Sequence, residues 1–202
     1  MSADNHHSIS CFNLVSTKTV PIKIANKWAR NLFNCNTEYI LNVCKGRSCE
    51  GTGRTMVSLT EKEQRKYIKG GFDVKDGFLS PNSETGQCPN KLISGFCGVH
   101  DTSMQPFGCI ASPFTLNKNG TLVLRYRYTK FKCYGNGLPA YKVFRKSLDL
   151  LFGKREAARI CHILDTEKRD FIAKMPINNY KNLLYLDGLK RIFSERRGKE
   201  KK

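Results

Sequence analysis

The sequence contains no long apolar run: nothing in it approaches the roughly 18 apolar residues that a membrane-spanning helix requires. Its first ten residues, MSADNHHSIS, have neither the basic start nor the apolar core of a secretory signal. We therefore expect a cytoplasmic protein with no membrane partner. Thiols stay reduced in that compartment, so the nine cysteines, an odd number, favour metal ligation over a disulfide framework.

Acidic residues are scarce, 17 against 35 lysines and arginines, and the formal net charge is +18. Basic residues exceed acidic ones by nine in 1–138 and again by nine in the much shorter 139–202. A surface of this charge attracts nucleic acid or an acidic protein partner, but it does not specify a fold. Metal-bound thiolates would offset part of the charge, because each bound cysteine is anionic.

Several familiar site patterns are missing. Two short C-x2-C hooks, the strong signal of a zinc ribbon, do not occur. There is also no glycine motif placed after a strand for an organic cofactor, and no nucleophile stands in a recognisable relation to a base. Whether the protein is an enzyme therefore stays open at this level.

What the sequence does have is a dense stretch from Cys88 to Cys109, with Cys97 between them. Two more cysteines lie upstream in CKGRSCEG and one lies downstream in FKCYGNG, and both of these segments are rich in glycine. Glycines allow backbone amides to approach a cluster and bond its sulfurs. The candidate metal ligands are therefore Cys44, Cys49, Cys88, Cys97, Cys109 and Cys133.

Two further residues stand near this set. His100 follows Cys97 by three residues and could be a ligand, a residue that supports a ligand, or a core histidine. Cys35 precedes the first glycine-rich segment and could add a thiolate. Four thiolates complete either a zinc site or an iron–sulfur cluster of the 4Fe-4S type, so the spacing alone does not choose between the metals.

Local signals in the first half predict short elements. Residues 25–33 have the pattern of a short amphipathic helix in which Trp28 anchors the core. Thr60 followed by Glu63 is the signature of a capping box, and the glycine pair at 70–71 predicts the end of that helix. The segment after it, 73–87, is rich in turn residues and predicts a connector or hairpin.

An Asn-Gly pair at 119–120 predicts a hairpin, with alternating apolar residues from Leu122 to Tyr128 forming its second strand. Arg125, Arg127 and Lys130 would then lie on the opposite face of that strand. The same region contains an aromatic group that could stack on nucleic-acid bases, formed by Tyr126, Tyr128, Phe131 and Tyr134.

From Pro139 onward the pattern is helical. A first helix is predicted to end at Gly153, and a second, KREAARICHILD, turns Cys161 toward the core, so Cys161 is expected to be a core thiol and not a ligand. A strand or connector and a last helical segment follow. The charged end of the chain, 194–202, is predicted to be disordered.

These signals predict an α+β protein: a small irregular cysteine-rich metal-binding domain with short strands and covering helices, followed by a helical extension. The expected segments are an N-terminal leader with a short helix (1–34), the cysteine-cluster domain (35–138) and the basic helical extension (139–202).

The order of the motifs resembles the YkgJ-type cysteine-cluster family, whose members are described as zinc- or iron-chelating. The resemblance covers about residues 35–137 and rests on CKGRSCEG, VSLTEKEQ, CPNKL, GFCGVHD, QPFGCIASPF and FKCYGNG. Ser48 stands where the family opening usually has a second adjacent cysteine, and Gln105 and Ile110 stand where it usually has arginines.

The resemblance implies a thiolate-bound metal, either an iron–sulfur cluster or zinc, that could serve a modification enzyme or a redox role. The alternative is a basic, zinc-stabilised module that binds nucleic acid or another protein. Residues 139–202 lie outside the resemblance.

Overall fold

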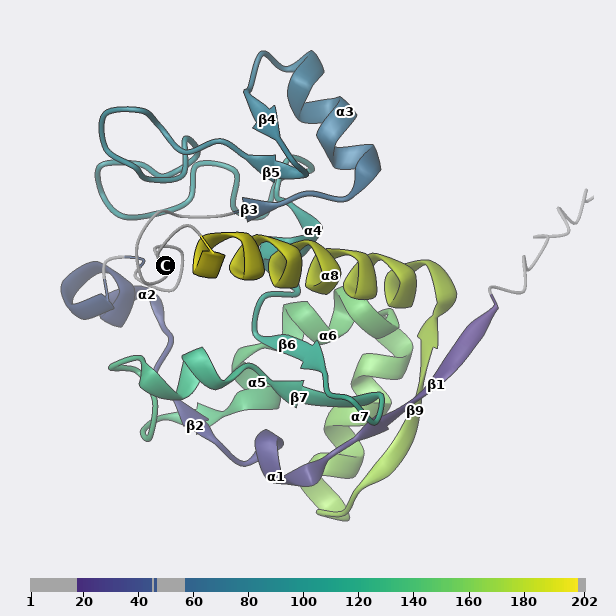
Figure 1. The fold of residues 1–202 in the computed structure, drawn as a ribbon. Helices are drawn as coiled ribbons and strands as arrows, with labels where there is room; N and C mark the ends of the chain where they lie inside the picture. The colour runs from purple at the N-terminus through teal and green to yellow at the C-terminus, as the bar shows by residue number, and fades with distance from the viewer. Residues whose placement is uncertain (1–17, 45, 47–56, 200–202) are drawn as a thin grey trace, which may run out of the picture.

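The structure is a computed structural model that describes residues 18–44, 46 and 57–199 (Figure 1). It contains strands and helices in mixed order, so the predicted α+β class is confirmed at that level. The strands are β1 (Thr19–Ile24), β2 (Leu32–Phe33), β3 (Val57–Ser58), β4 (Val74–Lys75), β5 (Phe78–Leu79), β6 (Phe114–Leu116), β7 (Thr121–Leu124), β8 (Leu138–Pro139) and β9 (Phe171–Pro176).

Most of the helices are short, and the longest comes last. They are α1 (Asn26–Ala29), α2 (Thr37–Tyr39), α3 (Glu61–Lys69), α4 (Phe107–Ile110), α5 (Ala140–Val143), α6 (Arg145–Phe152), α7 (Lys154–Thr166) and α8 (Ile177–Lys199). A π-helix covers Ile40–Cys44 and a 3-10 helix covers Tyr126–Lys130. None of the helices within the described residues is long and apolar enough to cross a membrane.

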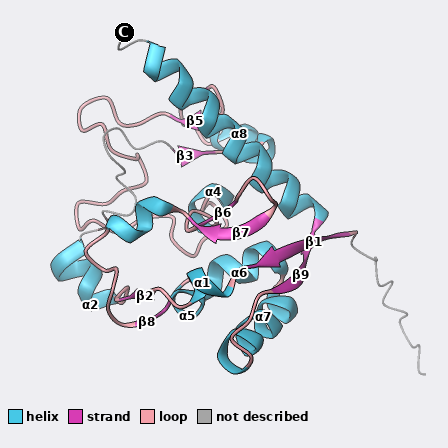
Figure 2. Ribbon diagram, turned by 60° about the horizontal axis from the view of Figure 1, so that its bottom comes forward, coloured by secondary structure: helices cyan, strands magenta, loops and turns pink. Residues whose placement is uncertain are grey.

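The main sheet has the strand order β6-β7-β1-β9. Its central strand β1 pairs in parallel with β7 and in antiparallel with β9, where Thr19 lies opposite Pro176 and Ile24 opposite Phe171. Ile22 and Ile24 alternate with exposed residues along β1, as expected for a strand with one buried face. The helix pair α6–α7 lies beside β9 (Figure 2), and α8 crosses the middle of the molecule, in contact with α6 and β9.

The larger hydrophobic core draws on segments that are distant in sequence. Its buried side chains come from 22–33, 107–133 and 140–186, and Trp28 is among them as predicted. The boundaries expected at 34/35 and 138/139 therefore do not separate independent cores: β1 from the first segment pairs with β9 from the third.

A second, smaller core lies on the other side of α8 (Figure 1). The three-stranded sheet β3-β5-β4 and helix α3 bury Val57, Leu59, Tyr67 and Leu79 there. Cys88 and Cys109 are among the partly buried side chains packed against this cluster. Two of the candidate ligands therefore pack against the second core.

Local predictions hold where a local signal was strong. The capping box of Thr60 and Glu63 is present, and Gly70 ends α3. The segment after α3 forms the β4–β5 hairpin, and the Asn-Gly turn joins β6 to β7. Gly153 ends α6 with φ of 80°, a left-handed conformation that glycine adopts without strain.

Four predictions need correction. The helix predicted over 25–33 is only α1, because the chain turns into β2 at Leu32. The strand predicted to reach Tyr128 ends at Leu124 and becomes a 3-10 helix that buries Tyr128 against the core. The helix predicted from Pro139 to Gly153 is divided in two at Phe144. The predicted disordered end is helical as far as Lys199, since α8 continues to that residue.

Candidate metal centre

Cys88, Cys97 and Cys109 all act electrostatically on the phenol of one tyrosine, and we call them the Tyr67 trio. Tyr67 comes from α3 and is 1% exposed, and its hydroxyl donates to the Met104 carbonyl oxygen at 2.6 Å. Burial, with smaller contributions from the charges of the three thiols, raises the pKa of Tyr67 to about 12, whereas its hydrogen bond with Asn90 acts in the opposite direction. Three thiols from separate segments therefore lie within electrostatic reach of a single buried group.

Backbone hydrogen bonds hold the loop 88–97, which carries two members of the Tyr67 trio. Lys91 N donates to the Cys88 carbonyl at 2.9 Å, and Lys91 also forms an isolated β-bridge with Cys97. The Asn90 side chain donates to the Tyr67 hydroxyl at 3.1 Å. Cys109 comes from α4, which packs close to β3 and α8 at Gly108. These contacts hold the backbone of the segments that carry the three cysteines in place.

A second set, Cys35, Cys44 and Cys133, gathers at the end of the π-helix, and we call it the Cys133 trio. Asn34 N donates to the Cys133 carbonyl at 2.8 Å, which places Cys35 next to Cys133. Burial raises the pKa of Cys133 to about 11, followed by the charges of Cys35 and Cys44. A thiol in this position stays protonated until a cation, such as a metal ion, stabilises its thiolate.

One glycine contact joins the segments that carry the two trios. Gly46 follows Cys44 by two residues, has φ of 72°, and lies so close to Gly95 that a Cβ atom on it would be 2.1 Å from the Gly95 carbonyl oxygen. Gly95 in turn precedes Cys97 by two residues. Only a residue without a side chain allows this approach, which explains the glycine between the cysteines of CKGRSC.

Neither trio is closed into a ligand set: in the described part of the chain, no three His, Cys, Asp or Glu side chains stand as a group that could hold a metal ion. The chemistry of the donors nevertheless fits a thiophilic metal, since each trio consists of thiols alone. The predicted ligand Cys49 lies outside the described residues, as does Cys11.

Two further residues discussed in the sequence analysis are His100, a possible ligand, and Cys161, a predicted core thiol. The ring of His100 faces Gln105, with Nδ1 and the Gln105 amide nitrogen 3.2 Å apart, and its Nε2 is 3.7 Å from Asp101. Burial and the nearby Lys146 lower the pKa of His100. Cys161 packs against the larger core, as predicted, and its thiol donates weakly to the Tyr141 carbonyl at 3.9 Å.

Beside Cys109 lies a group of cations that the sequence pattern did not reveal. Arg125 forms an ion pair with Asp187 on α8, and Thr115 donates to the same carboxylate at 2.7 Å. Lys190 lies one helical turn after Asp187, on the same side of α8. Burial lowers the pKa of Lys190 to about 8, and Arg125 lowers it further, whereas Asp187 and Cys109 act in the opposite direction.

The group contains a third cation. Arg127, whose guanidinium bonds the Ser112 hydroxyl, also lowers the pKa of Lys190, so Arg125, Arg127 and Lys190 lie within electrostatic reach of one another around Asp187. The buried Nε of Arg125 makes no hydrogen bond to any described residue. The spacing of Asp187 and Lys190 was visible in the sequence, but their approach to Arg125 and Cys109 depends on how α8 crosses α4.

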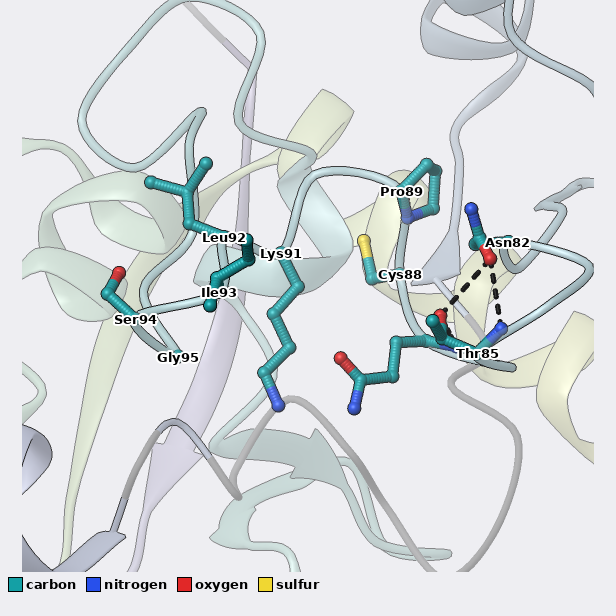
Figure 3. A pocket seen from close by; sticks show the side chains of 10 residues that line it. Asn82, Thr85, Cys88, Pro89, Lys91, Leu92, Ile93, Ser94 and Gly95 are labelled. Carbon is teal, nitrogen blue, oxygen red and sulfur yellow. Dashed lines mark hydrogen bonds between the residues drawn. The ribbon is translucent and has the colours of Figure 1, made fainter.

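A pocket of about 400 Å³ opens beside Cys88 (Figure 3). Asn82 shapes its rim, because its side-chain oxygen accepts hydrogen bonds from the Thr85 amide at 2.9 Å and the Thr85 hydroxyl at 3.2 Å. The Cys88 side chain lies between Lys91 and Pro89 in this pocket. The pocket gives an ion from solution access to Cys88.

The carboxylate of Glu63 connects the capped helix to the segment that carries Cys109. One oxygen accepts from the Thr60 amide and hydroxyl, both at 2.8 Å, and the other accepts from the Phe107 amide at the start of α4. Replacing Glu63 with glutamine puts an amide group against these donors. We expect it to lower the free energy of unfolding by about 1–3 kcal/mol, measured by urea denaturation.

The control for this change is Glu61→Gln in the same first turn, where the carboxylate is exposed. That variant loses only the helix-dipole interaction, about 0.3–1 kcal/mol. Equal losses in the two variants would mean that the bond from Phe107 to Glu63 contributes nothing to the position of α4.

Comparisons with protein-family models, with curated proteins and with solved structures return no match for this chain.

Proposed function

We propose that this protein chelates metal through cysteine thiolates, as an iron–sulfur or zinc protein of the kind that the motif order resembles. The proposed ligands come from Cys44, Cys49, Cys88, Cys97, Cys109 and Cys133, with Cys35 as an additional member. The observation that carries the proposal is that six cysteines, spread over almost a hundred residues, fall into two sets that act electrostatically on Tyr67 and on Cys133, although no three of them form a closed ligand group within the described residues.

The surroundings of the trios also support the proposal. Metal-bound cysteines are thiolates, so a site assembled from them is anionic. The positive charge of Arg125, Arg127 and Lys190 beside Cys109 would offset that charge. Buried Tyr67 and the second core would keep water from one side of the sulfurs. With zinc the centre would be structural, and with iron it would serve a redox or modification reaction, in a cytoplasmic protein in either case.

The proposal is tested by purifying the full chain without oxygen and measuring its zinc, iron and sulfide content together with its visible spectrum. A brown protein with iron and acid-labile sulfide supports the cluster. A colourless protein with zinc supports the structural site. A chain that folds and holds neither metal, even after reconstitution with each, overturns the proposal.

Replacing Lys190 with methionine should change the stability of the metal-free and metal-loaded proteins in opposite directions. Without metal the variant should be more stable, on the order of 2–3 kcal/mol at pH 7, because a partly buried cation with a depressed pKa opposes folding. That penalty is fully present below pH 8 and disappears between about pH 8 and pH 10.5 as Lys190 loses its proton in the folded state.

With metal bound, the same change removes positive charge beside an anionic centre, so metal affinity should fall about tenfold in a chelator competition. Lys190→Arg should keep the affinity, and Lys181→Met, an exposed lysine on the same helix, should change neither quantity. Unchanged affinity in Lys190→Met would show that the cation group does not act on the centre.

A second candidate function is nucleic-acid binding, favoured by the net charge of +18 and by side chains of the aromatic group that face solvent. Its test is the salt dependence of oligonucleotide binding, because each phosphate contact releases counterions and weakens with added salt. An acidic protein partner would use the same charge.

A further inference from the structure

The 3-10 helix Tyr126–Lys130 and the turn after it divide the aromatic group into an inner and an outer pair. Tyr128 is 6% exposed, its hydroxyl donates to the Ser112 hydroxyl at 2.9 Å, and its ring packs edge-on against Phe144 with centroids 5.7 Å apart. Phe131 packs against the larger core beside Tyr128. The inner pair therefore holds this segment firmly against the protein.

The outer pair faces solvent. Tyr126 is 73% exposed, and the Lys130 ammonium lies 4.9 Å from the centroid of its ring. Tyr134 is 36% exposed, and its ring is fixed from one side by an edge contact with Phe33, at a centroid distance of 5.5 Å. A tyrosine as open as Tyr126 contributes little to packing, and its ring is free to meet a ligand at the surface.

The segment that carries these two rings has charge of one sign. Residues 126–138 contain Arg127, Lys130 and Lys132, all exposed, and no acidic residue. Lysine and arginine beside open aromatic rings are the two components of a surface for single-stranded nucleic acid: the cations neutralise phosphates and the rings stack on unpaired bases. A duplex keeps its bases stacked on each other and offers exposed tyrosines nothing to stack on.

We propose that the outer face of residues 126–134 is a binding surface for single-stranded nucleic acid, with Tyr126 and Tyr134 as stacking platforms and Arg127, Lys130 and Lys132 as phosphate contacts. This inference rests on the second candidate function, nucleic-acid binding, and assigns that binding to a particular surface. Its main tests use Tyr126 and Lys130, which belong neither to a thiol trio nor to the cation group beside Cys109.

The test is fluorescence anisotropy of the full chain with labelled single-stranded DNA and RNA of 12 nucleotides, titrated at several salt concentrations. Tyr126→Ala should weaken binding roughly tenfold, since one stacked base is lost. Tyr126→Phe should bind like the wild type, because stacking needs the ring and not the hydroxyl. Both variants should unfold at the wild-type temperature, because the side chain is exposed.

The charge contacts are tested by a matched pair. Lys130→Gln should weaken binding and reduce the slope of log affinity against log salt by about one. Lys75→Gln removes an equal charge from β4, on the far side of α8 from β7 (Figure 1), and should leave the affinity within twofold.

The outcomes separate this inference from the function on which it rests. If the wild type binds but Tyr126→Ala binds equally well, the surface is wrong and the candidate function stands. If the wild type binds no single strand even at low salt, nucleic-acid binding itself fails. Tighter binding to a duplex, or to a polyglutamate peptide, than to the single strand would also overturn the inference and would favour backbone readout or an acidic protein partner.

Discussion

Replacing Cys109 with serine is expected to remove most of the bound metal and to destabilise the metal-loaded protein. Binding of a structural zinc ion is worth about 10–16 kcal/mol, so one of four thiolates accounts for about 3 kcal/mol, or roughly a hundredfold in affinity. The two measurements are metal content after gel filtration and thermal unfolding of the reconstituted protein. Cys88→Ser and Cys97→Ser should behave in the same way.

The metal-free protein provides the test of mechanism. Serine differs from cysteine by one atom, so without metal the Cys109→Ser variant should lose no more than about 1 kcal/mol. Cys161→Ala is the matched control, because that thiol is also partly buried but lies on α7 against the larger core. Full metal retention in Cys109→Ser, or an empty site in Cys161→Ala, would contradict the proposed ligand set.

Replacing Gly46 with alanine is expected to separate the segments that carry Cys44 and Cys97. The new methyl group would stand 2.1 Å from the Gly95 carbonyl oxygen, which is backbone and cannot rotate away. Left-handed strain adds about 1 kcal/mol. We expect a total loss of about 3 kcal/mol or more in urea denaturation, together with reduced metal content, because the clash can be relieved only by moving a loop.

Gly120→Ala isolates the conformational part of this effect. Gly120 has nearly the same backbone angle, with φ of 68° against 72° for Gly46, but a Cβ atom there meets nothing within 4 Å. Its loss should therefore be about 1 kcal/mol, with metal content unchanged. If the two variants were equally stable and held equal metal, the contact between Gly46 and Gly95 would be irrelevant to the centre.

Where the physical cause is local, the sequence alone was sufficient. The capping box at Thr60 depends on two side chains three residues apart, and the turn at Asn119-Gly120 depends on backbone angles that these residues accept. The α+β class, the two helices on either side of Gly153 and the core position of Trp28 follow from similar short-range patterns.

Where partners lie far apart in sequence, the sequence was insufficient. Residues 126–130 alternate like a strand, but the burial of Tyr128 against Phe144 makes them a 3-10 helix. Likewise, α8 was visible as a helix, yet only its crossing of α4 and β7 brings Lys190 to Arg125 and Cys109. Tertiary packing overrides local preference in such places, because burial of a large ring outweighs the small differences between backbone conformations.

For the candidate metal centre, too, some features follow from the sequence and others only from the tertiary structure. The choice of cysteines as candidate ligands came from their number, order and glycine-rich surroundings, which are properties of the sequence itself. Their division into a trio around Tyr67 and a trio around Cys133 came only from the tertiary structure. The reason is that β1 pairs with β7 and β9, and β2 with β8, so pairings across about a hundred residues or more determine which thiols become neighbours.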